Sequence, residues 1–203
     1  MERTLNFRHN YVRLLAPKLW KDWRMNCDSL EFERPMISFL KEYYGNKPLV
    51  GCEVGVREGI NTDRILRTLN IKKLYLVDPY LPYYEPSPAL TVFAGSAANQ
   101  ENVMKEAKRF LSRYNDRIVW LRKSSDDAVT NIHDALDFCY IDGDHCYNQV
   151  RRDIDNYEGI LNKGGVIGGH DFATLYLGLC RAVLENKDWF TIQGKNCDWW
   201  KVK

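Results

Sequence analysis

The sequence predicts an α/β fold whose sheet is doubly wound and mostly parallel, with an antiparallel hairpin at its C-terminal end. Three observations predict it. Short apolar runs alternate with helical patterns from residue 48 onward, polar residues and glycines follow the apolar runs, and two strand-like segments close the chain. Strands that alternate with helices form parallel sheets, because each helix carries the chain back across the sheet.

Length and composition indicate one ordinary globular domain. The chain has 203 residues, enough for one substantial core, and its net charge of +2 gives no electrostatic footprint for a nucleic acid. The N-terminus lacks the apolar stretch of a signal peptide and no run approaches a membrane span, so we expect a soluble, cytoplasmic protein without membrane contact. The six cysteines form no C-x-x-C pair, which favours reduced thiols over disulfides or a zinc site.

The first 47 residues are expected to form a helical cap of the same domain, and residues 48–203 the domain proper. Apolar residues at helical spacing predict a helix over 9–24 and a second helix over 29–44. Asp28 and Glu31 occupy capping-box positions for the second helix.

Seven strands are expected in residues 48–203, two of them in the closing hairpin. They are 49–54, 73–77, 117–121, 138–141 and 164–169, then 189–193 and 198–202, with Gly194-Lys195-Asn196 as the final turn. Helices are expected after the first strand (with Ile65, Leu66 and Leu69), over 97–113, over 125–132, between 145 and 164 (with Val150, Ile154, Tyr157 and Leu161 facing inward), and over 174–186. Four prolines between 79 and 88 predict a loop without regular structure.

The turn after the first strand reads Glu53-Val54-Gly55-Val56-Arg57-Glu58-Gly59. Its glycines allow a tight turn and the close approach of a ligand, although an ordinary strand-to-helix turn would use them too. The turn is neither G-x-G-x-x-G nor a P-loop. Asp78 ends the next strand, where a carboxylate suits two ribose hydroxyls. Together, the turn and Asp78 indicate a ligand that carries a nucleoside.

Two later strands end in acids and histidines. Tyr140-Ile141 leads into Asp142-Gly143-Asp144-His145, and Gly164-Gly165-Val166-Ile167-Gly168-Gly169 leads into His170-Asp171. Carboxyl ends of parallel strands meet at one edge of a sheet, so we expect a polar cluster there. Asp144 or His170 could equally cap or brace the loops.

Taken together, these motifs resemble the class I S-adenosylmethionine-dependent methyltransferases, with a Rossmann-like seven-stranded sheet. The match runs from about Leu49 to Lys203. The I-D-G-D-H and G-G-H-D segments resemble the small-molecule O-methyltransferase branch, which includes catechol, caffeoyl-CoA and macrolide-sugar enzymes. The resemblance implies that Gly55 and Gly59 line the methionine part of the cofactor, supported by Glu53, and that Asp78 holds the ribose. It also implies that Ser125 and Asp126 lie by the adenine.

The resemblance further implies a divalent cation at Asp142 and Asp171, with His170 as a third candidate ligand and Asp142 close to the cofactor as well. His145 is then the general base. Carboxylate ligands favour Mg²⁺ or Mn²⁺ over Zn²⁺. The catechol-type enzymes have Asp-Asn where this chain has His170-Asp171, and lysine where it has His145. The sugar-modifying members match better, so we expect a sugar or other natural-product-like hydroxyl as acceptor.

Two alternatives stay open at this point. His145, His170 and one aspartate could form the facial iron site of an oxygenase, which would leave the glycine turn and Asp78 without a role. The chain could also be a catalytically inactive S-adenosylmethionine-binding protein. A nucleic-acid methyltransferase is disfavoured, because a basic stripe is missing. The acceptor and any homo-oligomer remain open.

Overall fold

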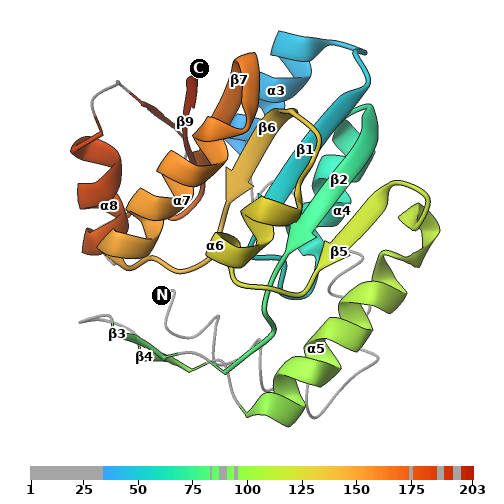
Figure 1. Cartoon of the computed structure of the whole chain (residues 1–203), viewed down its shortest axis with the longest axis vertical. Helices are drawn as coiled ribbons and strands as arrows, with labels where there is room; N and C mark the ends of the chain where they lie inside the picture. Colours follow the sequence, from blue (N-terminus) through green and yellow to red (C-terminus); the bar gives the residue numbers. More distant parts are fainter. Residues whose placement is uncertain are drawn as a thin grey trace. The chain divides into compact units, whose positions relative to one another are not determined.

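The structure, a computed structural model, describes residues 34–82, 84–86, 91–93, 96–173, 176–186, 190–193 and 198–203. Its main sheet has seven strands in the order β5-β2-β1-β6-β7-β9-β8 (Figure 1). Five are parallel: β1 (Leu49–Val54), β2 (Ile71–Val77), β5 (Ile118–Leu121), β6 (Leu136–Ile141) and β7 (Leu161–Gly169). β9 (Asp198–Val202) and β8 (Thr191–Gln193) are antiparallel. The predicted doubly wound sheet with its closing antiparallel pair is confirmed.

Helices cover both faces of this sheet (Figure 1). One face packs against α3 (Pro35–Tyr44), α4 (Ile60–Thr68) and α5 (Ala97–Phe110). The other packs against α6 (Ser125–Ala128), α7 (Tyr147–Gly159) and α8 (Leu177–Leu184). Two short 3-10 helices, η1 (Ser112–Tyr114) and η2 (Val129–Asn131), follow α5 and α6.

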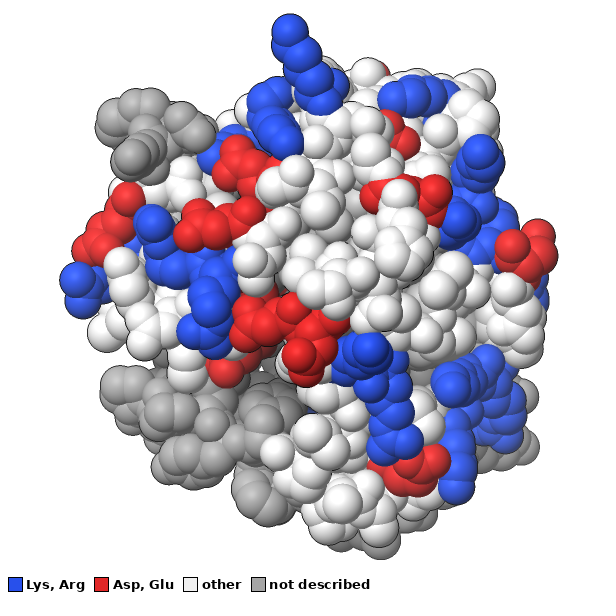
Figure 2. Space-filling model, in the orientation of Figure 1, with Lys and Arg blue, Asp and Glu red and all other residues white. Residues whose placement is uncertain are grey.

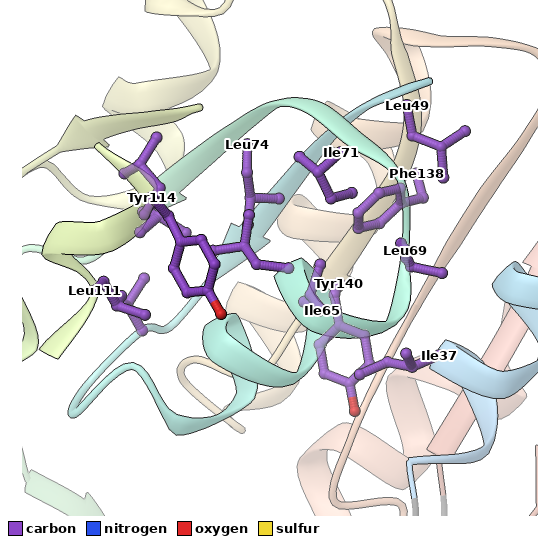
Figure 3. Close-up of a cluster of buried hydrophobic side chains, with 14 of the residues drawn as sticks. Ile37, Leu49, Ile65, Leu69, Ile71, Leu74, Leu111, Tyr114, Phe138 and Tyr140 are labelled. Atoms are coloured by element: carbon purple, nitrogen blue, oxygen red, sulfur yellow. The ribbon is translucent and has the colours of Figure 1, made fainter. Parts of the chain in front are cut away.

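The core consists of two apolar clusters, one on each face, because successive strand residues point to opposite sides. In β2, Leu74 and Leu76 belong to the first cluster, whereas Tyr75 and Val77 belong to the second. β6 divides in the same way. Figure 3 shows the first cluster, in which Phe138 and Tyr140 of β6 lie with side chains from α3 and α4, such as Ile37 and Ile65. Because both faces of the sheet are covered, the C-terminal halves of these strands, Leu74–Val77 and Phe138–Ile141, are apolar at every position.

The second predicted helix begins later than expected. Arg34 has a non-helical backbone (φ −119°, ψ 84°), and α3 starts at Pro35. A residue before proline is disfavoured in the helical region by contact with the proline ring. A continuous helix over 29–44 is therefore wrong. Residues 29–33, the cap residues Asp28 and Glu31, and the helix predicted over 9–24 lie outside the described residues.

Two other predictions need correction. The proline-rich segment was expected to lack regular structure, but β3 (Tyr84–Pro86) pairs antiparallel with β4 (Thr91–Phe93). A two-stranded ribbon consists of edge strands, where proline is tolerated. Leu161 was placed on a helix, yet α7 ends at Gly159 and Leu161 begins β7. Its burial continues the helical spacing by coincidence, so the pattern could not reveal the boundary.

Arg34–Lys203 form one compact unit, so α3 belongs to the same body as the sheet. The described cysteines, Cys52, Cys139, Cys146 and Cys180, are free thiols. Among the described helices, none combines the length and apolarity needed to cross a bilayer. Lys and Arg side chains alternate with Asp and Glu on the face in Figure 2. The predicted final turn at 194–196 lies outside the described residues.

Candidate active site

The glycine turn is built around left-handed backbone conformations. Gly55, Arg57 and Gly59 have φ of 87°, 49° and 79°. A side chain at Gly55 would overlap the backbone carbonyl of Asp142, and one at Gly59 would come 2.7 Å from Leu111. The missing side chain at Gly55 thus allows the protein's own backbone to pass close to the turn. This contact holds the turn against the end of β6.

Glu53 supports this turn from inside the protein. It is fully buried; Asn61 Nδ2 donates to its Oε1 at 2.9 Å, and the Thr62 hydroxyl donates to its other oxygen. Burial raises the pKa of Glu53 to about 8, although these two hydrogen bonds oppose the shift. The carboxyl group therefore joins β1 to the first turn of α4. A contribution of Glu53 to cofactor binding stays a prediction.

Asp78 also holds the turn. Its Oδ2 accepts hydrogen bonds from the backbone of Val56 (3.0 Å) and Arg57 (2.8 Å), and its Oδ1 accepts one from the backbone of Tyr80 (2.8 Å). Burial raises the pKa of Asp78 against the effect of these bonds. Of the roughly four acceptor positions of a carboxylate, three are occupied. The expected grip on two ribose hydroxyls would require one of these bonds to be released.

Ser125 and Asp126, expected beside the adenine, both bond to α7. The Ser125 hydroxyl donates to Asp153 at 2.6 Å and accepts from Gln149 at 2.9 Å. Asp126 accepts from Arg152 at 3.2 Å and from Asn156 at 3.2 Å. The hydroxyl of Ser125 is therefore committed within the protein, and a direct cofactor contact by either side chain stays a prediction.

The ends of β6 and β7 bring three predicted residues together. Asp142, His145 and Asp171 each offer a ligand atom within 4.8 Å of the others. His145 Nε2 lies 3.1 Å from Asp171 Oδ2, and the imidazole stacks on Tyr176 with ring centroids 4.1 Å apart. Asp171 has a left-handed backbone (φ 63°), which is uncommon outside glycine. The polar cluster expected at this edge is present.

His170 and Asp144 have different positions from those three. His170 Nδ1 lies 2.7 Å from Asp198 Oδ1, and its Nε2 lies 2.6 Å from Arg34 Nη1. Both ring nitrogens thus face protein partners, and the metal-ligand prediction for His170 is not supported by this geometry. His145 stands in the cluster instead. Asp144 Oδ1 accepts the backbone N–H of Cys146 at 2.7 Å, so it closes a turn just before α7.

Residues 52–172, more than half of the chain, match the model of a family described as a methyltransferase domain. The chain belongs to this methyltransferase family. Its mostly parallel sheet with a closing antiparallel pair is the fold of the solved S-adenosylmethionine-dependent methyltransferases. The resemblance seen in the sequence is confirmed.

Relatives of this methyltransferase are distant. An uncharacterized protein of Acanthamoeba polyphaga mimivirus is 30% identical over 141 residues; the match covers 68% of this chain and 58% of that protein, so the chain spans less than two thirds of that relative. A candidate caffeoyl-CoA O-methyltransferase from Staphylococcus aureus has a TM-score of 0.61 at 12% identity, with 97% and 99% of the chains covered.

Two further solved structures have the same fold. An O-methyltransferase from Bacillus cereus, in complex with S-adenosylhomocysteine, has a TM-score of 0.58 at 16% identity, with 98% and 97% of the chains covered. An rRNA methylase from Streptococcus thermophilus has a TM-score of 0.55 at 14% identity, with 83% and 95% covered. At these identities the structures share the fold of the methyltransferase, which does not specify an acceptor.

Sequence reasoning missed Arg34 and Asp198, which lie behind the cluster. Asp198 is fully buried in β9 and accepts hydrogen bonds from the Tyr140 hydroxyl (3.0 Å), the Met36 backbone (3.0 Å) and His170. A charged residue at the start of a strand gave a weak signal for burial. Arg34 gave none, because its partners lie far along the chain.

The charges divide the cluster into unlike carboxyls. Burial raises the pKa of Asp142, against the attraction of His170 and Arg34. Burial acts in the same direction on Asp171, but the nearby His145, His170 and Arg34 outweigh it and lower the pKa of this carboxyl. Asp171 is therefore the more firmly ionised partner for His145.

Proposed function

We propose that this methyltransferase transfers the methyl group of S-adenosylmethionine to a hydroxyl group of a small molecule, with His145 as the general base. The observation that carries the proposal is the pair of His145 and Asp171, which lie 3.1 Å apart beside Asp142. An imidazole held by a carboxylate, at the sheet edge where ligands of this fold bind, suits removal of a hydroxyl proton.

When bound, S-adenosylmethionine supplies a methyl group on a positively charged sulfur, already activated for transfer. The acceptor hydroxyl gains this methyl group and loses its proton, while the sulfur keeps the electron pair of the broken bond and becomes a thioether. The protein must align the acceptor and take up the proton. Because His145 Nε2 faces Asp171, we assign Nδ1 as the atom that receives the proton. Asp171 then stabilises the imidazolium.

We assign the acceptor to the small molecules, with a sugar or another aliphatic hydroxyl as the first choice. The similarity to the Bacillus cereus O-methyltransferase and to the candidate caffeoyl-CoA enzyme supports an oxygen acceptor. The motifs around His145 and His170-Asp171 resemble those of the sugar-modifying methyltransferases more than those of the catechol enzymes, which supports a sugar hydroxyl. The mixed charges on the face in Figure 2 give no support to a nucleic-acid acceptor.

A divalent cation fits the carboxylates of this cluster. Asp142 and Asp171 would hold it, and two oxygen donors favour Mg²⁺ or Mn²⁺. Such a cation would lower the pKa of an acceptor hydroxyl. A histidine that gives its lone pair to a metal cannot accept a proton with the same atom, so we keep His145 as the base and leave it outside the ligand set.

The iron-oxygenase alternative loses its basis. It required His145 and His170 to ligate one metal with an aspartate, but both ring nitrogens of His170 lie within hydrogen-bonding distance of Asp198 and Arg34. The glycine turn moreover lies within residues 52–172, which match the methyltransferase family, and this supports a role in binding the cofactor. The alternative of an inactive S-adenosylmethionine-binding protein is decided by the experiment below.

The first test is binding of S-adenosylhomocysteine by calorimetry, followed by an acceptor screen with labelled S-adenosylmethionine. The screen includes sugars, catechols, nucleosides and a short RNA, with and without EDTA and added Mg²⁺. We expect cofactor binding and label transfer to a hydroxyl compound. Binding without transfer to any acceptor would favour the inactive protein, and transfer to the RNA alone would overturn the small-molecule assignment.

The second test concerns the base. His145→Ala should lower kcat by about a hundredfold or more while the affinity for S-adenosylhomocysteine changes little. His133→Ala is the matched control, since His133 is exposed and precedes β6 at the other end of the strand. An equal loss of turnover and cofactor affinity in His145→Ala would contradict a role as base.

A further inference from the structure

Arg34 is a largely buried cation within the polar network. It lies just before α3, and only 13% of its side chain is exposed. Burial lowers the pKa of this guanidinium, but the nearby Tyr140 and the carboxylates of Asp142, Asp198 and Asp171 outweigh burial and raise it. A buried guanidinium is retained only where ion pairs and hydrogen bonds compensate for the loss of water.

Arg34 lies against the imidazole of His170. Its Nη1 is 2.6 Å from Nε2 and 3.1 Å from Nδ1. The same ring also meets two carboxylates: Asp198 Oδ1 lies 2.7 Å from Nδ1, and Asp171 Oδ1 lies 3.4 Å from Nε2. The guanidinium and the two carboxylates therefore hold the ring between them, directly before Asp171.

The other nitrogens of Arg34 reach both halves of the site. Nη2 lies 4.0 Å from Asp142 Oδ2 at the end of β6. Nε donates to Asn61 Oδ1 at 3.3 Å, and Asn61 in turn donates to Glu53 below the glycine turn. One planar group thus links the cofactor turn to the ends of β6 and β7. The guanidinium can do this because its donors diverge in a rigid plane.

We propose that Arg34 is a positioning residue, whose guanidinium holds the imidazole of His170 in place and fixes the ends of β6 and β7, which carry Asp142 and Asp171, relative to the glycine turn. The spatial role rests on the contacts above, and its consequence for turnover rests on the proposed function. Arg34 itself touches neither reactant in this assignment. Its loss should disturb the alignment of the acceptor more than the binding of the cofactor.

Imidazole NMR tests the role without any need for an acceptor. The chain has four histidines, so long-range proton–nitrogen spectra are simple, and His170→Gln identifies the signals of His170. In Arg34→Met the nitrogen signals of His170 should shift, because the ring loses the guanidinium nitrogen that lies 2.6 Å from its Nε2. In Arg34→Lys they should shift less. Arg67→Met, which removes an arginine paired with Asp63 on α4, is the control and should leave His170 unchanged.

Turnover provides the second measurement. In Arg34→Met, kcat should fall by about a hundredfold, as expected for a misaligned reactant, while the affinity for S-adenosylhomocysteine stays within a few-fold. Millimolar guanidinium should restore part of the activity of Arg34→Ala, which a merely unfolded variant would not allow.

The outcomes separate the two proposals. Unchanged His170 signals in folded Arg34→Met, or an unchanged kcat, overturn the role of Arg34. Failure of the unmodified protein to bind S-adenosylhomocysteine or to transfer methyl groups overturns the proposed function, and the NMR result still stands or falls by itself. Should Arg34→Met not fold, Arg34→Lys, which keeps the charge, gives the same comparison.

Discussion

Gly55 and Asp142 are in direct backbone contact: a Cβ at position 55 would overlap the carbonyl group of Asp142. The first residue belongs to the turn expected to hold the cofactor, and the second to the cluster expected to hold the acceptor. The Asp142 backbone N–H also donates to Val54 at 2.7 Å. The two halves of the site are therefore positioned by one short backbone contact, which suits a reaction between two ligands.

Gly55→Ala tests this contact. The substitution combines a left-handed φ of 87° with the overlap at Asp142, so we expect a loss of stability on the order of 3 kcal/mol and weaker binding of S-adenosylhomocysteine. Gly159→Ala is the matched control, because it lies in α7 with no atom within 4 Å of the new methyl group. It should stabilise the protein slightly. Urea unfolding measures the stability of both variants. Equal stabilities would show that the backbone at Asp142 can move aside for the new methyl group.

Asp78→Asn separates a structural role of Asp78 from ribose binding. The amide keeps one acceptor oxygen but loses the other, so at least one backbone N–H of Val56, Arg57 or Tyr80 loses its partner. We expect a loss of about 2 kcal/mol of stability without any ligand, together with weaker cofactor binding. Thermal and urea unfolding of the ligand-free protein give the first value and calorimetry the second. Weaker binding at unchanged stability would mean that Asp78 serves the ribose alone.

Glu53→Gln should alter the pH dependence of stability. The folded pKa of about 8 exceeds the ordinary value of 4.5, so the folded state retains a proton that the unfolded chain releases. The stabilising contribution is full below pH 4.5 and is lost as the pH rises through about 8. The loss is on the order of 4 kcal/mol. The glutamine variant should lack this decline between pH 5 and 9, whereas exposed Glu42→Gln on α3 should keep it. If the urea midpoints of the two variants changed with pH in the same way, the effect of burial on Glu53 would be contradicted.

The strands and their polar ends could be predicted because local chemistry specifies them. The run from Phe138 to Ile141 is apolar at every position because both faces of β6 are covered, and it stops at Asp142 because the edge of the sheet begins there. The same reasoning located the ends of β1, β2 and β7. Such features depend on neighbours along the chain.

The connections behind the site could not be predicted in this way. Arg34 meets His170 across 136 positions of sequence, and nothing near either residue encodes the contact. Arg57 has the left-handed φ of 49° that the sequence would suggest for a glycine. The roles of His170 and Ser125 changed for the same reason, since their hydrogen-bond partners come from β9 and α7. Side-chain partners of this kind follow from the packed fold.

The buried carboxyl of Asp153 gives a further pH-dependent prediction. It is 1% exposed; Ser125 and Gln149 bond to its Oδ1, and its Oδ2 has no hydrogen-bond partner among the described residues. Burial raises its pKa from 3.8 to about 6. Folded Asp153 therefore holds a proton that the unfolded chain has released. Its contribution to stability is lost as the pH rises through about 6, by an amount on the order of 3 kcal/mol.

Asp153→Asn removes this ionisation and keeps an oxygen for Ser125 and Gln149. As the pH rises from about 4 to about 6, the free energy of unfolding of the variant should gain on that of the unmodified protein, and the difference should stay constant at higher pH. Asp155→Asn, an exposed neighbour on α7, should follow the unmodified protein throughout. A difference between Asp153→Asn and the unmodified protein that stays constant with pH would mean that Asp153 is hydrated, because water at Oδ2 would stabilise the ionised form.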